Sequence, residues 1–259
     1  MYKCKKENEK EIIEYIGKSY GQCLYLYVDL LKYGFDNENI NVWFQKEEDE
    51  IKALVLQYYT GVHVFSKEVE FDVKEVVDLL KEINPSMICG MKWTLDKIKD
   101  YFDNYEMEIG IVGELTNLKV YDTEGCYKAN AEEIKELAEL LAEDESLSKP
   151  YGFELLYKQL LERYEENFGR NFIYRDNGKI VATASTYAEK GGVAVISGVM
   201  VHPEYRGKGL SKNVLSAVCD NLKKDGFDVF SYYYIPSATR MHQSVGFEPI
   251  GDWAKLVRL

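Results

Sequence analysis

The sequence has few cysteines and histidines, which form disulfides and bind metals, and few prolines, which kink or end helices. It contains 5 cysteines, 3 histidines and 5 prolines among 259 residues. The cysteines are far apart and odd in number, and no pair has the spacing of metal ligands. We therefore expect reduced thiols and no metal site, and we interpret Cys219, His63 and His202 as structural residues.

Positive charge and long apolar segments are also scarce. There are 32 Lys and Arg against 44 Asp and Glu, a formal net charge of −12. Nucleic acids and anionic membranes select basic surfaces, so neither is an expected partner. No apolar run approaches the roughly 18 residues of a membrane span, and the charged N-terminal stretch lacks the apolar segment of a signal peptide. Together with the reduced cysteines, these absences predict a cytoplasmic protein. We expect a monomer or homodimer, although no feature of the sequence selects between them.

An internal repeat is present instead. Residues 41–61 and 171–192 both show a strand, a polar turn and a longer strand, and each segment follows a helical pattern. In the second segment Asp176, Asn177 and Gly178 form a tight-hairpin signal. The repeat predicts two related domains, 1–125 and 126–259, divided near Gly125.

The hydrophobic patterns beyond these two segments predict alternating helices and strands. In the first half we expect a helix, a buried strand, a helix and a strand pair at 73–83, 86–89, 95–102 and within 106–115. In the second half we expect a strand, a helix, a strand, a helix and two terminal strands at 193–201, 208–224, 229–234, 237–245, 247–250 and 254–259.

The most informative segment is VMVHPEYRGKGLSKNVL, in which a strand leads through two glycines and two cations into a helix. The first N–H groups of a helix have no intrahelical partners, and glycines allow a ligand to approach them closely. Such a helix start binds phosphate groups. A plain strand-to-helix turn is the alternative. A Walker loop is excluded because His202 and Gly209 stand where Gly and Ser or Thr are required, and a dinucleotide fingerprint is excluded by Lys212.

The remaining pattern, Arg-x-x-Gly-x-Gly/Ala after a strand, resembles the GNAT superfamily of acyl-CoA-dependent N-acyltransferases. The later segment ATRMHQSVGFEPIG is similar to another stretch of that family. The resemblance covers about the last half of the chain, and the two-half layout is most similar to the FR47-like and glycine N-acyltransferase-like branches. It implies an α/β (α+β) GNAT fold, with a mixed, mostly antiparallel sheet flanked by helices and a degenerate GNAT-like N-terminal half.

The resemblance also implies an acyl-CoA site. The pantetheine arm would lie along the strand 193–201, where Gly198 makes a bulge near Val199 or Met200 plausible. Ser211 stands where the family has Gly or Ala. The implied CoA-binding residues are Val199, Met200, Val201, Arg206, Gly207, Lys208, Gly209, Leu210 and Ser211.

The sequence offers few candidates for catalytic proton transfer. His242 stands where the family has a tyrosine that protonates the departing CoA thiolate, so it is the candidate general acid. An imidazole packed on a helix face is the alternative reading. The strand 193–201 carries no carboxylate, which leaves Glu189 or a water chain to accept the proton of the amine.

The function implied is transfer of an acetyl group from acetyl-CoA to a primary amine of a small molecule or amino acid, by direct attack in a ternary complex. The alternatives are transfer from a longer acyl-CoA and an acyl-CoA-binding sensor without turnover. The first half has no glycine-rich helix start, and it carries Glu68, Glu70 and Asp72 where phosphates would lie. We therefore expect it to bind no CoA.

Overall fold

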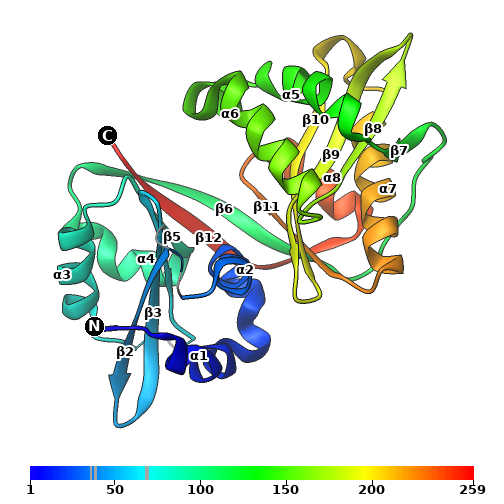
Figure 1. Ribbon diagram of the computed structural model, residues 1–259. Coiled ribbons are helices and arrows are strands. Elements are labelled where there is room, and N and C mark those ends of the chain that lie inside the picture. The colour runs from blue at the N-terminus through cyan, green and yellow to red at the C-terminus, as the bar shows by residue number, and fades with distance from the viewer. Residues whose placement is uncertain (36, 38–39, 68–69) are drawn as a thin grey trace. The chain divides into compact units, whose positions relative to one another are not determined.

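The chain divides into two compact units (Figure 1). The computed structural model describes residues 1–35, 37, 40–67 and 70–259, with the backbone alone for 145–151. The first unit comprises Met1–Val112 together with Pro249–Leu259, and the second comprises Gly113–Glu248. The division differs from the predicted boundary near Gly125, because a continuous strand rather than a loop leads from one unit into the other.

The first unit is a mixed sheet with helices on both faces. Strands β2, β3 and β4 form an antiparallel meander, and β4 pairs parallel with β5. Helices α1 and α2 pack on one face, and α3 and α4 pack on the other. The elements in chain order are β1 (Tyr2–Lys3), α1 (Glu9–Ile16), α2 (Leu24–Tyr33), β2 (Ile40–Glu47), β3 (Glu50–Tyr58), β4 (Gly61–Phe65), α3 (Val73–Ile83), β5 (Met87–Met91), α4 (Lys92–Ile98) and β6 (Tyr105–Leu115), whose last residues lie in the second unit.

The second unit has the same plan. Strands β8, β9 and β10 form an antiparallel meander, and β10 pairs parallel with β11. Helices α5 and α6 cover one face, and α7 lies on the other. The elements are β7 (Cys126–Lys128), α5 (Ile134–Ala142), α6 (Glu145–Glu165), β8 (Asn171–Asp176), β9 (Lys179–Lys190), β10 (Val193–Val201), α7 (Leu210–Lys224), β11 (Asp228–Tyr233), α8 (Pro236–Val245) and the first two residues of β12 (Phe247–Arg258), whose remainder lies in the first unit.

The order of elements therefore repeats along the chain. In each half a helix pair is followed by a three-stranded meander, a helix, a parallel strand and a further helix. The predicted meanders and the hairpin at Asn177–Gly178 are confirmed, and both turn residues have positive φ. The predicted fold class, a mixed and mostly antiparallel sheet flanked by helices, is confirmed as well. Within the described residues, no helix is both long and apolar enough to cross a membrane.

Each unit is completed by a strand from the other half of the chain. Strand β12 pairs antiparallel with β5, with Trp253 opposite Met91 and Val257 opposite Met87. Strand β6 occupies the matching position beside β11. Two expectations were wrong here, because the segments 106–115 and 247–258 each lie in one strand instead of two. Gly251 does not end β12, since the chain continues in extended form onto β5.

Candidate functional site

The glycine-rich loop opens onto the start of α7. Gly207 and Gly209 have φ of +80° and +83°, and a Cβ added at either would meet nothing within 4 Å. Among the described residues, none accepts a hydrogen bond from the N–H groups of Leu210 and Ser211, the first two of the helix. The helix start therefore combines open space, unpaired donors and the positive end of the helix dipole.

Two cations flank this opening. The Arg206 side chain is exposed and its Nε donates to the carbonyl of Val201 over 3.2 Å, which ties it to the end of β10. The Lys208 ammonium lies 4.6 Å from the ring centroid of Tyr205. Both charges lie in the loop itself, so they add to the attraction for an anion at the helix start.

The strand that leads into this loop separates from its parallel neighbour. Pairing of β10 with β11 runs from Val193–Asp228 to Ile196–Ser231, although β10 continues to Val201 and β11 to Tyr233. Beyond Ile196 the backbone of β10 that faces β11 is released from the sheet ladder. An extended ligand arm can pair with such a strand.

A bulge lies in the released part of β10. Ser197 is opposite Ser185 and Met200 is opposite Thr183, so two residues of β10, Gly198 and Val199, stand where β9 has one. Gly198 has φ +56°, a conformation that a residue with a Cβ rarely adopts. The bulge predicted near Val199 or Met200 is confirmed, and it re-aims backbone N–H groups out of the ladder.

The side chains of the other residues in the predicted CoA site pack largely into the core, so these residues would contact CoA mainly through their backbone atoms. Met200 is buried against α5 and α6, while Val199 and Val201 are half-buried against the α7 core. Leu210 is buried beneath the helix start, and Ser211 is half-buried. The structure thus brings the predicted residues of the loop and strand together along one path in the second unit.

His242 belongs to α8 rather than to the loop or to β10, and its side chain lies inside the core. Its side chain is 3% exposed and stacks on Tyr233 with ring centroids 4.6 Å apart. Nδ1 donates to the carbonyl of Ala238 at 2.8 Å, and Nε2 accepts from the hydroxyl of Ser231 at 2.9 Å. Burial lowers the pKa of His242 to about 4, against a smaller raising effect of the Ala238 bond.

This environment argues against the acid role suggested for His242. A general acid must carry a transferable proton at the working pH and reach the departing atom. The His242 ring is neutral at pH 7, and both of its nitrogens are used inside the fold. The family's tyrosine has been replaced here by a ring that packs on its helix and strand.

The other ionisable candidates are also engaged. Glu189 holds the buried Arg170 through an ion pair of 2.6 Å, so it is not a poised base. Burial raises the pKa of the Cys219 thiol and lowers that of His63 to about 4. The residues that the structure describes contain no group of three or more His, Cys, Asp or Glu side chains placed to hold a metal ion.

The corresponding helix start of the first unit is closed. The Asp72 side chain caps α3 by accepting a hydrogen bond from the N–H of Glu75 at 3.1 Å, and Glu75 also binds the amino group of Met1. Glu70 is exposed in the preceding loop. Glu68 lies outside the described residues. Carboxylates thus occupy or flank the position at which a phosphate would need donors.

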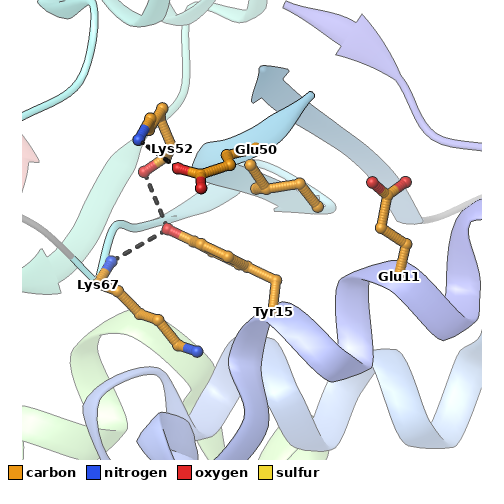
Figure 2. A pocket seen from close by; sticks show the side chains of 6 residues that line it. Glu11, Tyr15, Glu50, Lys52 and Lys67 are labelled. Carbon is orange, nitrogen blue, oxygen red and sulfur yellow. Dashed lines mark hydrogen bonds and ion pairs between the residues drawn. The ribbon is translucent and has the colours of Figure 1, made fainter. Parts of the chain in front are cut away.

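A surface pocket belongs to the first unit (Figure 2). Its centre is Tyr15, whose hydroxyl donates to the carbonyl of Lys52 at 2.9 Å and accepts from the N–H of Lys67 at 3.1 Å. The Lys52 ammonium pairs with Glu50 at 2.9 Å. These polar groups satisfy one another, so the pocket does not present the unpaired donors found at α7.

Residues that the sequence reasoning missed lie beneath the bulge. Asn171, Thr183 and Ser185 are buried polar residues of β8 and β9, and each has a side-chain oxygen without a partner among the described residues. The hydroxyl of Tyr233 is another such atom. The alternation of Thr183 and Ser185 with alanines was the available signal, because it places small polar groups on one face of a buried strand.

Comparison with known proteins agrees with this geometry. Residues 134–247 match the family described as "Acetyltransferase (GNAT) family". A search of the curated proteins gave no match. Three solved structures illustrate the likeness in fold.

The GCN5-related N-acetyltransferase from Sphaerobacter thermophilus shares 15% identity, with a TM-score of 0.67 over 98% of this chain and 93% of that one. The acetyltransferase from the GNAT family from Colwellia psychrerythraea shares 14% identity, with a TM-score of 0.59 over 95% and 97%. The GCN5-related N-acetyltransferase from Kribbella flavida shares 18% identity, with a TM-score of 0.61 over 80% and 86%. The resemblance first seen in the loop after β10 is confirmed: this chain carries, at residues 134–247, an acetyltransferase domain of the GNAT family.

Proposed function

We propose that the second unit transfers an acetyl group from acetyl-CoA to the primary amine of a small molecule or amino acid, by direct attack in a ternary complex. The observation that carries this proposal is the continuity of the bulged, released strand β10 with the open helix start of α7. One end offers donors to a pyrophosphate and the other offers donors to a thioester.

The loop is the proposed pyrophosphate site. The N–H groups at Gly209, Leu210 and Ser211 are the proposed donors beside the open space at the two glycines, and Arg206 and Lys208 supply positive charge. Anions are stabilised at such a helix start by the unpaired donors and the dipole together. The backbone donors are the larger contribution, since the two side chains are exposed and screened by water.

The bulge is the proposed acyl site. The pantetheine arm would lie in the gap between β10 and β11, and a backbone N–H at Gly198 or Val199 would donate to the thioester oxygen. That oxygen gains negative charge as the amine nitrogen attacks the carbonyl carbon, and a fixed donor stabilises it. The new C–N bond then replaces the C–S bond, which leaves an acetamide and the CoA thiolate.

In this proposal water accepts the proton that the amine loses and supplies the proton that the thiolate gains. The amine must attack in its neutral form and loses one proton during the reaction, while the thiolate gains one. His242 and Glu189 are both held by other groups, so neither is assigned to these transfers. Without a tuned base, the rate should rise with pH as the amine, whose free pKa is about 10 for an alkyl amine, deprotonates.

We extend the proposal to the first half, which we interpret as a degenerate copy of the same fold. Its element order matches that of the second half, but Asp72 caps the helix that corresponds to α7. It should therefore bind no CoA.

The test combines calorimetry with acetyl-CoA and a screen of amines in which released thiol is measured. Binding with one site per chain and thiol release that requires an amine would support the proposal. Binding without release from any amine would favour the sensor alternative, which the engaged His242 makes worth testing. Faster release from a longer acyl-CoA would identify the other alternative.

A further inference from the structure

Three buried oxygens in the sheet of the second unit lack hydrogen-bond partners. They are Asn171 Oδ1, Thr183 Oγ1 and Ser185 Oγ, and their residues are 3%, 0% and 2% exposed. No partner exists for them among the residues that the structure describes. Burying a polar atom without a partner costs free energy, so three in one place require an explanation.

The three side chains share one face of the sheet. Asn171 lies directly opposite Ser185, and Thr183 lies two residues from Ser185 on the same strand. Directly opposite residues, and residues two apart on a strand, point to the same side. The three oxygens therefore form a row across β8 and β9.

The row ends at the bulge that carries the proposed acyl site. A Cβ built on Gly198 would lie 3.7 Å from the Ser185 hydroxyl and 3.6 Å from Cδ2 of Leu141. Leu141 belongs to α5, and it packs in the apolar cluster that covers this face. The Leu141 side chain is thus the part of α5 that lies against the bulge at Gly198.

The missing partners are not a general property of these strands. Thr186, also on β9 and 1% exposed, accepts a hydrogen bond from the N–H of Arg170 at 2.8 Å and bonds Glu189 at 2.7 Å. The fold satisfies that hydroxyl completely. On β9 the contrast is therefore between Thr186 and the two hydroxyls that face α5 beside the bulge, those of Thr183 and Ser185.

The row is also uncharged. Arg175, which reaches α5 from β8, is fully engaged by ion pairs of 3.1 Å with Glu133 and 2.6 Å with Glu136. The unpaired groups are two hydroxyls and an amide oxygen, and such groups pair with a hydroxyl or an amide without bringing a net charge into the core.

We propose that Asn171, Thr183 and Ser185 bind an uncharged hydroxyl or amide group on the acceptor amine, which reaches them when the Leu141 side chain moves off Gly198. This assignment rests on the proposed acetyl transfer at the bulge and adds the class of acceptor. The amine nitrogen would lie at the bulge while the second polar group enters the row. Within the described residues nothing else in the fold offers these three oxygens a partner, which leaves them available to the acceptor.

The first experiment tests the unpaired hydroxyls through stability. Thr183→Val and Ser185→Ala remove a hydroxyl that has no partner, so the urea midpoint should rise. Thr186→Val is the matched control on the same strand, and its midpoint should fall because Arg170 and Glu189 lose a partner. A fall for Thr183→Val comparable with that of the control would show that its hydroxyl is satisfied, and would overturn the proposal.

The second experiment tests specificity with aminopropanol and butylamine, which have equal numbers of heavy atoms. We expect the wild-type kcat/KM to favour aminopropanol by roughly tenfold or more, since a site built for a hydroxyl rejects an analogue without one. Thr183→Val and Ser185→Ala should bring the ratio towards one while the Kd for acetyl-CoA stays unchanged. Transfer to both amines with an unaltered ratio in the variants would defeat the acceptor assignment alone. No transfer to any amine would defeat the proposed function, and the assignment with it.

Discussion

The Ser231 hydroxyl lies 2.9 Å from Nε2 of His242 and joins β11 to α8 inside the second unit. The opposite ring nitrogen is bonded to the Ala238 carbonyl, one turn earlier on the same helix. A neutral imidazole satisfies both contacts, because one nitrogen donates and the other accepts. The residue that the family resemblance marked as an acid therefore fixes a helix to a strand.

The first prediction concerns this contact. His242→Phe should lower the free energy of unfolding by about 1–3 kcal/mol, because the buried Ser231 hydroxyl loses its partner. Adding Ser231→Ala should restore part of that loss, since no orphaned hydroxyl remains. Urea unfolding of the two single variants and the double variant measures the coupling.

The same variants distinguish packing from catalysis. If His242 only packs, the turnover of folded His242→Phe should stay within about tenfold of wild type, whereas loss of a general acid costs roughly 10²-fold or more. A loss on the larger scale, with the Kd for acetyl-CoA unchanged, would reinstate the acid role. His242→Tyr serves as the comparison that carries the family's usual residue.

The second prediction is a pH dependence of stability. The pKa of His242 is about 4 in the folded protein, below the ordinary histidine value of about 6.5. The unfolded chain therefore binds more protons between these values, and stability present above pH 6.5 is lost as the pH falls towards 4. The full shift corresponds to about 3 kcal/mol.

His63 titrates in the same window, because burial also lowers its pKa to about 4. The measurement is therefore the difference between wild type and His242→Phe from pH 7 to pH 4, with His63 present in both. We expect wild type to lose more stability over this range than the variant. Parallel pH profiles would show that His242 is protonated at its ordinary pKa in the folded state.

The third prediction tests the helix start with a matched pair of glycines. Gly209 and Gly226 have φ of +83° and +82°, and a Cβ at either meets nothing within 4 Å. Valine at either position carries the same kind of backbone strain, of about 1–2 kcal/mol. Gly209→Val alone should abolish acetyl-CoA binding, because its side chain fills the proposed pyrophosphate position. Calorimetry measures the acetyl-CoA affinity of both variants. Equal affinities would show that the pyrophosphate does not bind at Gly209.

The fourth prediction concerns the exchanged strand. A chain ending at Glu248 lacks the β12 residues that pair with β5, and Trp253, Ala254 and Leu256 leave the first core. We expect limited proteolysis to cut the first unit rapidly in this variant. A chain lacking only Leu259, which is 84% exposed, should resist the protease as wild type does. Equal resistance of the truncated chain would show that β12 is dispensable.

Local chemistry in the sequence predicted much of the second unit. The strand at 193–201 and the hairpin at Asn177–Gly178 were predicted because their glycines and apolar patterns act over a few residues. The helix start at Gly209 and the bulge at Gly198 followed from the same kind of signal.

The sequence did not predict long-range partners. Whether His242 points to a ligand or to Ser231 depends on β11, eleven positions away along the chain and adjacent only after folding. The exchange of β6 and β12 has no local signal, since each segment has only the mixed apolar and polar pattern of an ordinary strand. The row of unpaired oxygens could not be predicted either, because an atom is known to lack a partner only when the positions of all its neighbours are known.

The exchange of β12 has a consequence for the order in which the protein is made. Residues 249–259 leave the ribosome only after the whole second unit, which takes roughly ten seconds at about 5–20 residues per second. Throughout that interval β5 lacks the strand it pairs with in the finished protein, and an unpaired strand edge invites association with other chains. The first unit, although most of it is made first, can therefore be completed only after the second unit has been synthesised.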